Sequence, residues 1–353
     1  MLTRRRFQWA AVLAMAPLSV WAKPLTINVL THSSFDVPKA LIQSFETEQQ
    51  VKLKFIKAGD AGEMLNKLII TRKAPIADVV FGVDNTLLPK TMGLDLFEPY
   101  SGPLTQSQSQ AKMVPTAPQS GIAHGLVPID HGYVTINFQK AWFEKQKLAL
   151  PTDLMQLTQP AYKNLLVLPN PNTSSTGFAF LLATIAEMGE ESAFAWWAQM
   201  RQNGLKVVKG WTEAYYTDFA QNGGPFPMVV SYATSPAAEV FYSKTKLSTA
   251  PTDNLLLKGG VYQQVEGAAL IKQAKVDPQK QAKALAFIDW LRSAPVQHAL
   301  QTTMWMYPAQ SGVNNDAALS HSPTPKDFAV LPAQDIAENQ KRWLAKFSQV
   351  VLR

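Results

Sequence analysis

Behind an apolar leader, the chain alternates between strand and helix patterns, and this alternation constrains the fold more than any other feature. Strand patterns occupy residues 25–30, 51–55 and 78–82. Amphipathic helical spacing fills the two intervals, at residues 39–48 and 63–72. A strand, helix, strand, helix, strand order predicts a parallel sheet with crossover helices, which is an α/β fold.

The rest of the chain continues the α/β pattern less regularly. Further strand patterns lie at residues 132–138, 165–168, 228–231 and 261–271. Helical patterns lie at residues 177–188 and 281–292, and residues 101–120, rich in Ser, Gln and Pro, predict a surface loop. Because 353 residues exceed the size at which one core usually stops growing, we expect two packed lobes.

Residues 1–22 have the pattern of a cleavable signal peptide. Three arginines, Arg4 to Arg6, precede an apolar run that ends at Val20-Trp21-Ala22, and we expect cleavage after Ala22. The alternative is a membrane anchor, but the run is shorter than the roughly 20 residues that span a bilayer. The arginines also resemble a twin-arginine signal, although they suit the general secretory route equally well. Either route predicts a periplasmic mature protein.

Charge and cysteine content exclude several classes of function. The formal net charge falls from +7 to +4 once the three leader arginines are removed, and no block of Lys and Arg marks a nucleic-acid surface. The chain has no cysteine, which excludes disulfides, thiolate metal sites, cysteine nucleophiles and lipoprotein attachment. We therefore expect a monomer that binds neither nucleic acid nor a cofactor.

Six motifs in one order carry a family resemblance. They are Phe81–Asn85, Asp130–Tyr133, Thr173–Gly177, Lys209–Tyr215, Ser231–Pro236 and Trp305–Pro308. Together they resemble the thiamine-binding periplasmic proteins of thiamine ABC importers, across the whole mature chain. The resemblance implies a ligand, thiamine or a thiamine phosphate, that is delivered to a membrane permease with its ATPase.

Membership of that family also implies an architecture. It is the two-lobed type II periplasmic-binding-protein fold, in which crossing strands join two α/β lobes and the ligand lies in the cleft between them. On this basis lobe 1 comprises residues 24–128 and 262–300. Lobe 2 comprises residues 129–261 and 301–353, with the C-terminal tail packed onto it.

Aromatic residues in the motifs suit a flat cation. Thiamine presents an aminopyrimidine, a cationic thiazolium and a hydroxyethyl tail, and aromatic faces attract such cations. The resemblance assigns Trp211, Tyr232 and Trp305 to ligand contact, with Tyr215 and Tyr307 as further candidates. The competing interpretation is that these rings are core residues.

Polar candidates follow predicted strands, where α/β sheets bind ligands. Asp60 is predicted either to cap the helix behind it or to face the vitamin, and the resemblance favours the ligand. Asp84 and Asn85 follow the third strand and could contact ligand or form a turn.

A helix N-terminus could hold a phosphate through its free N–H groups. The turn that precedes the predicted helix at 177–188 supplies Ser174, Ser175, Thr176 and Gly177 for this role. Ordinary N-capping by Ser or Thr would explain the same residues.

Two departures from the family pattern thin the predicted aromatic cage. His32 stands where relatives have a tyrosine, before a shortened loop at 33–38, and Ala238 replaces a second tyrosine. We include His32 among the ligand-binding candidates.

Two alternative functions remain open. An enzyme of the thiaminase type is disfavoured because its cysteine nucleophile is missing, and the five histidines lack metal-ligand spacing, so we predict no catalytic or metal-binding residue. The same fold could instead bind ferric ion, a polyamine or a phosphonate. Tyr215-Tyr216 could act as an iron-binding pair, but Trp211 and Trp305 would then have no role.

Overall fold

The structure is a computed structural model that describes residues 24–103, 125–310 and 312–353. The predicted signal peptide and most of the predicted loop at 101–120 lie outside the described residues. Within the described ranges, no helix has the length and apolar character needed to cross a bilayer.

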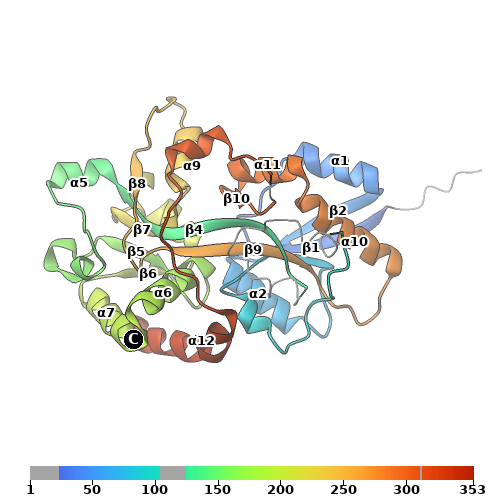
Figure 1. Ribbon diagram of the computed structural model, residues 1–353, viewed down its shortest axis with the longest axis horizontal. Helices are drawn as coiled ribbons and strands as arrows, with labels where there is room; N and C mark the ends of the chain where they lie inside the picture. The colour runs from blue at the N-terminus through green and yellow to red at the C-terminus, as the bar shows by residue number, and fades with distance from the viewer. Residues whose placement is uncertain (1–23, 104–124, 311) are drawn as a thin grey trace, which may run out of the picture.

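One sheet runs through the described part of the chain, in the order β2-β1-β3-β9-β4-β7-β5-β6. Two parallel groups occupy its ends, and an antiparallel pair lies between them (Figure 1). The strands of the path are β1 (Leu25–Thr31), β2 (Val51–Lys57), β3 (Val79–Asp84), β4 (Val127–Gln139), β5 (Leu166–Pro169), β6 (Lys206–Val208), β7 (Met228–Tyr232) and β9 (Tyr262–Leu270). Two further strands pair with β4: β8 (Thr252–Leu255) and β10 (Tyr307–Pro308). The α/β fold predicted from the sequence is confirmed.

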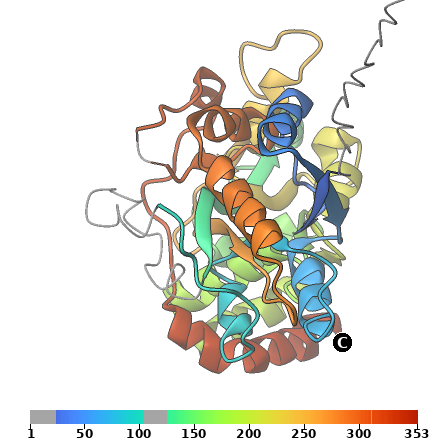
Figure 2. The ribbon, with the colours of Figure 1, turned by 90° about the vertical axis from the view of Figure 1, so that its right-hand side faces the viewer.

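The first parallel group, β2-β1-β3, is covered on both faces because its strands alternate their buried side chains. Ile27 and Val29 of β1 face a core formed with α1 (Lys39–Gln49), α10 (Pro278–Leu291) and α11 (Ala294–Thr303). Leu30 faces the opposite core, formed with α2 (Ala61–Ile70). In the view turned by 90°, α10 crosses in front of this group (Figure 2).

The second parallel group, β7-β5-β6, packs against the largest core cluster. Its helices are α6 (Ser175–Met188), α7 (Glu190–Gln202) and the C-terminal α12 (Ala333–Phe347). Trp196, Trp197 and Phe347 are almost fully buried there, and α12 lies along the base of the molecule (Figure 1). The tail thus packs onto this half of the protein.

The two halves are joined by β4 and β9, which pair antiparallel from Val127↔Ala268 to Val134↔Tyr262. β9 also pairs with β3 on the first side, and β4 also pairs with β7 on the second. Both strands are buried along almost their whole length, and they carry polar side chains, such as Asp130 and Glu266, within that buried stretch. They form the floor between the halves.

Candidate ligand-binding cleft

A cleft of about 1140 Å³ lies where the two halves meet. The carboxyl ends of five strands lead into it: His32 follows β1, Asp60 follows β2, Ser175 follows β5, Trp211 follows β6, and Tyr232 ends β7. Ligands of open α/β sheets gather at such strand ends. A space of this size accommodates a molecule of several rings.

One wall of the cleft is aromatic. Trp211 stacks on Tyr215 with ring centroids 5.3 Å apart and an 18° interplanar angle, and its Nε1 donates to Ser231 Oγ at 2.8 Å. Tyr232 lies edge-on to Trp211 at 6.2 Å. These contacts hold the indole ring partly exposed beside the cleft, as a cation-binding face requires.

Trp305 lies at another part of the cleft in a strained conformation. Its φ of 58° is in the left-handed region, which a bulky residue rarely adopts. Thr234 donates to its carbonyl at 2.6 Å, and Tyr242 packs edge-on against its ring at 5.7 Å. Backbone strain of this kind is concentrated at ligand sites, where the surrounding contacts enforce it.

Asp60 both caps a helix and spans the cleft. Its carboxylate accepts from Ala61 N at 2.7 Å as the N-cap of α2, and Glu63 completes the capping box. The other oxygen accepts from the backbone N–H of Trp211, on the opposite side, at 2.9 Å. Burial raises the pKa of Asp60, while the hydrogen bond from Trp211 opposes that rise. The predicted cap is therefore confirmed, and Asp60 also lines the cleft, where its contact with the ligand stays a prediction.

Two more contacts close the same end of the cleft. Lys209 Nζ lies 2.9 Å from Glu63 Oε1, and Gly62 packs directly against the backbone of Thr173. With Asp60, these contacts join the N-terminus of α2 to the segments that precede α6 and follow β6. The structure thus shows the cleft in a closed arrangement at this end.

The N-terminus of α6 points into the cleft through Ser175 and Thr176, both of which line it. Thr176 donates its hydroxyl to Tyr232 Oη at 3.3 Å. A helix N-terminus with hydroxyl side chains offers hydrogen-bond donors to an anionic group.

The floor of the cleft carries Glu266, in the middle of β9. It is 5% exposed, and its Oε1 lies 3.3 Å from His32 Nε2. Burial lowers the pKa of His32, but the nearby Glu266, with the charges of Asp60 and Asp84, outweighs this effect and the pKa is raised overall. These acids favour the protonated form of His32 more than an ordinary environment does.

The cleft is acidic although the whole chain is basic. Six carboxylates line it against two lysines, whereas the chain has a net charge of +7. The carboxylates belong to Asp36, Asp60, Glu63, Glu213, Glu239 and Glu266, and the lysines are Lys57 and Lys209. This local excess of negative charge favours a cationic ligand.

Eight of the twelve predicted site residues line the cleft: His32, Asp60, Ser175, Thr176, Trp211, Tyr215, Tyr232 and Trp305. Four do not, and each has a structural role instead. Asp84 is fully buried and accepts from Thr86 and Leu87 as a turn former, and Asn85 pairs with the backbone of Gln263 and Val265. Ser174 is buried behind the wall as the residue before α6.

Gly177 serves close packing. A Cβ there would lie 1.9 Å from the carbonyl oxygen of Pro169, so glycine lets α6 approach the end of β5. Tyr307, a further candidate, is also buried away from the cleft, beside His131 and Tyr133. These five residues support the cleft without facing it.

Sequence reasoning missed several cleft residues, above all Glu266. Its signal was present, because a single acid interrupts the otherwise uncharged strand pattern at 261–271. Tyr242, which is 62% exposed, also lines the cleft and had no distinguishing pattern. Tyr216, which is 57% exposed, lines it too, and the sequence had indicated it only as part of a possible iron-binding pair.

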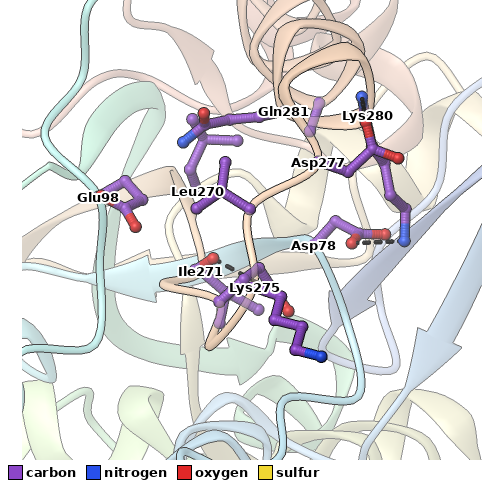
Figure 3. Close-up of a pocket in the computed structure, with 11 residues that line it drawn as sticks. Asp78, Glu98, Leu270, Ile271, Lys275, Asp277, Lys280 and Gln281 are labelled. Atoms are coloured by element: carbon purple, nitrogen blue, oxygen red, sulfur yellow. Dashed lines mark hydrogen bonds and ion pairs between the residues drawn. The ribbon is translucent and has the colours of Figure 1, made fainter.

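A second, smaller cavity of about 100 Å³ lies between the end of β9 and the start of α10 (Figure 3). Lys280 Nζ lies 2.7 Å from Asp78 Oδ1 at this cavity, and Leu270 at the end of β9 and Ile271 after it line the cavity. It is about a tenth the size of the cleft, so the cleft is the candidate site.

Comparison with known proteins agrees with this geometry. The sequence model of the bacterial extracellular solute-binding proteins matches residues 74–339. This chain belongs to that family. The predicted resemblance to thiamine-binding periplasmic proteins is also confirmed: this solute-binding protein is 30% identical to the thiamine-binding periplasmic protein of Brucella suis biovar 1 (strain 1330), over 96% of this chain and 95% of the relative.

Other relatives extend the same result. The thiamine-binding periplasmic protein of Escherichia coli (strain K12) is 28% identical, over 97% of this solute-binding protein and 98% of the relative. The solved structure of a periplasmic thiamin binding protein superposes with a TM-score of 0.79 at 25% identity, covering 93% of this chain and 96% of that one. Iron-bound HitA from Pseudomonas aeruginosa superposes at 0.71 with 17% identity, covering 93% and 99%, and shares the two-lobed fold.

Proposed function

We propose that this protein binds thiamine or a thiamine phosphate in its cleft and delivers the ligand to an ABC permease and its ATPase. The observation that carries the proposal is the combination of an indole face, Trp211, with an excess of carboxylates in one cleft. A flat heteroaromatic cation uses both features. Relatives named for thiamine binding, similar over nearly their whole length, support the same ligand.

The phosphate of a thiamine ester would lie at the closed end of the cleft. Ser175 and Thr176 at the start of α6 provide donors there, and Lys209 lies at the same end, across from Glu63. The carboxylate of Asp60 lies in the same region, so a phosphate must share or displace its hydrogen bond from Trp211. We therefore expect unphosphorylated thiamine to bind at least as well as its esters.

The location and partners follow from the same proposal. The relatives are periplasmic proteins, which supports a periplasmic protein exported by residues 1–22. The protein acts as a monomeric binding protein without catalytic activity. Its lobes comprise residues 24–128 with 262–300, and residues 129–261 with 301–353, and they close around the ligand by a hinge in β4 and β9.

Ferric ion is the second candidate because iron-binding proteins share the fold. The Tyr215-Tyr216 pair, however, is poorly suited to it. Burial raises the pKa of Tyr215 well above its ordinary value, Glu239 raises it further, and the Tyr215 hydroxyl donates to Glu239 at 2.6 Å. Iron binding needs phenolates, which this environment opposes.

Calorimetric titration of the mature protein tests the proposal. Thiamine, its monophosphate and its diphosphate are compared with ferric citrate and with spermidine, in the wild type and in Trp211→Ala. We expect saturable binding of thiamine that Trp211→Ala weakens roughly tenfold, as loss of a cation–π face worth about 0.5–2 kcal/mol implies. Binding of ferric ion or spermidine but not thiamine would refute the assignment.

A further inference from the structure

Glu266 is the most deeply buried of the acids that line the cleft. It lines the cleft while only 5% exposed, and its one charged partner from outside the sheet is His32, at 3.3 Å. A buried carboxylate is costly unless donors surround it. The open side of this carboxyl group faces the ligand space.

Two more acids flank Glu266 on the neighbouring strands. In the register of the sheet, Asp84 of β3 and Asp130 of β4 are both paired with Glu266 of β9. Asp84 and Asp130 are fully buried, and neither lines the cleft. Three carboxyl groups thus form a row across three strands, and only the middle one reaches the ligand.

Two acids of the row have raised pKa values, which favours their protonated forms. Burial raises the pKa of Asp130 well above its ordinary value, and the adjacent charge of Glu266 raises it further. Burial also raises the pKa of Asp84 to about 6, against a hydrogen bond from Thr86. A protonated Asp130 can donate to Glu266 from behind, so that Glu266 keeps the negative charge and an accepting oxygen toward the cleft.

The remaining group that faces Glu266 is Tyr232, whose pKa burial raises well above the ordinary value. Its neutral hydroxyl accepts from Thr176 and keeps a hydrogen of its own, but among the described residues it makes no hydrogen bond to Glu266. The side of Glu266 toward the cleft is therefore open to a donor from the ligand.

We infer that Glu266 is a specificity-determining residue that accepts a hydrogen bond from the amino group of the ligand's pyrimidine, with Asp130 behind it as a positioning residue. The chemistry of the proposed ligand decides this orientation. Thiamine has two donor groups, this amino group and the hydroxyl of the tail, because the thiazolium carries its charge without an N–H. The tail is the end that we place at Ser175 and Thr176, which leaves the amino group as the donor for Glu266. A buried acceptor needs a donor and not merely a nearby cation. The inference rests on the proposed function.

Two variants and two ligands test it by calorimetry. Glu266→Gln is compared with the wild type for thiamine and for oxythiamine, in which oxygen replaces the amino group. We expect the wild type to prefer thiamine by roughly 10- to 100-fold, as loss of a hydrogen bond to a charged group implies. Glu266→Gln should remove most of this preference while binding oxythiamine within about threefold of the wild type.

Asp130 is tested by the same ratio of affinities. Asp130→Asn retains a donor toward Glu266 and should keep the preference, whereas Asp130→Ala should reduce it. Loss of packing alone would lower the affinities for thiamine and oxythiamine equally and leave their ratio unchanged. The preference of the wild type is measured first, so the test does not depend on the folding of any variant.

Equal affinity of the wild type for thiamine and oxythiamine would overturn the role of Glu266. An unchanged preference in Glu266→Gln would do the same. Absence of thiamine binding by the wild type would overturn the proposed function itself, and the two failures are thereby distinguished.

Discussion

Gly62 is the position at which a single methyl group should hold the cleft open. A Cβ built on Gly62 in α2 would lie 2.5 Å from the carbonyl oxygen of Thr173, on the opposite side of the cleft. Ordinary contact between such atoms begins at 3.4 Å. In Gly62→Ala, therefore, the two sides must separate by about 0.9 Å at this point or distort the backbone.

The separation would break the neighbouring contacts across the cleft. The bond from Trp211 N to Asp60, now 2.9 Å, would lengthen to about 3.8 Å, which is beyond hydrogen-bonding distance. Loss of a hydrogen bond to a charged group costs about 1.5–3 kcal/mol. Since ligand binding requires the closed form, the apparent Kd should rise about 10- to 100-fold.

The same substitution should not lower the thermal stability of the ligand-free protein, although it lowers ligand affinity. Alanine is favoured over glycine inside a helix by about 1 kcal/mol, so the ligand-free protein should unfold at the same or a higher temperature. Calorimetric titration and thermal unfolding measure the two effects separately. In the matched control Gly177→Ala, the new Cβ would meet Pro169 within one half, and the unfolding temperature should fall. Wild-type affinity in Gly62→Ala would refute the reasoning.

Three further predictions follow from the capping residues, a buried acid and the indole face. Asp60→Ala should lower both stability, by about 1 kcal/mol, and affinity, whereas Asp277→Ala, which removes the cap of α10 outside the cleft, should lower stability alone; equal effects of both on affinity would contradict this. Because the folded pKa of Asp84 is raised to about 6, its contribution to stability is present at low pH and lost as pH rises through 6. In the wild type this lowers the free energy of unfolding by up to about 3 kcal/mol between about pH 4 and about pH 7, and Asp84→Asn should remove that decrease in urea unfolding. A pH dependence of the free energy of unfolding identical to that of the wild type would argue against this. Trp211→Phe keeps an aromatic face but loses the bond to Ser231, so thiamine affinity should fall less than in Trp211→Ala; equal losses would show that the ring face is not used.

Local sequence patterns predicted most of the helices and strands. The elements from β1 to β3 were predicted to within a few residues because their side chains repeat at periods of two and 3.6 residues. β4 was predicted only over 132–138, although it begins at Val127, because its first half contains Asp130 and His131. Asp130 lies beside Glu266 of β9 and His131 beside Tyr307 of β10, and no local pattern reveals these contacts.

The candidate site shows the same division. Asp60 follows shortly after β2 and Asp84 ends β3, and the sequence offers no means of separating them. In the structure Gln264, 180 residues further along the chain, donates to Asp84, and β9 buries this carboxylate away from the cleft. Asp60 is not buried by β9 in this way and accepts from Trp211 across the cleft.

By itself, the sequence determined the α/β class, the order of the elements and the resemblance to the thiamine-binding periplasmic proteins, because these depend on local periodicity and on motif order. Only the tertiary structure decided which polar side chains face the ligand space and which lie beneath a neighbouring strand. The physical reason is that β9 returns between β3 and β4 from far along the chain, burying Asp84 and Asp130 while leaving Glu266 as the one acid of these three that reaches the cleft.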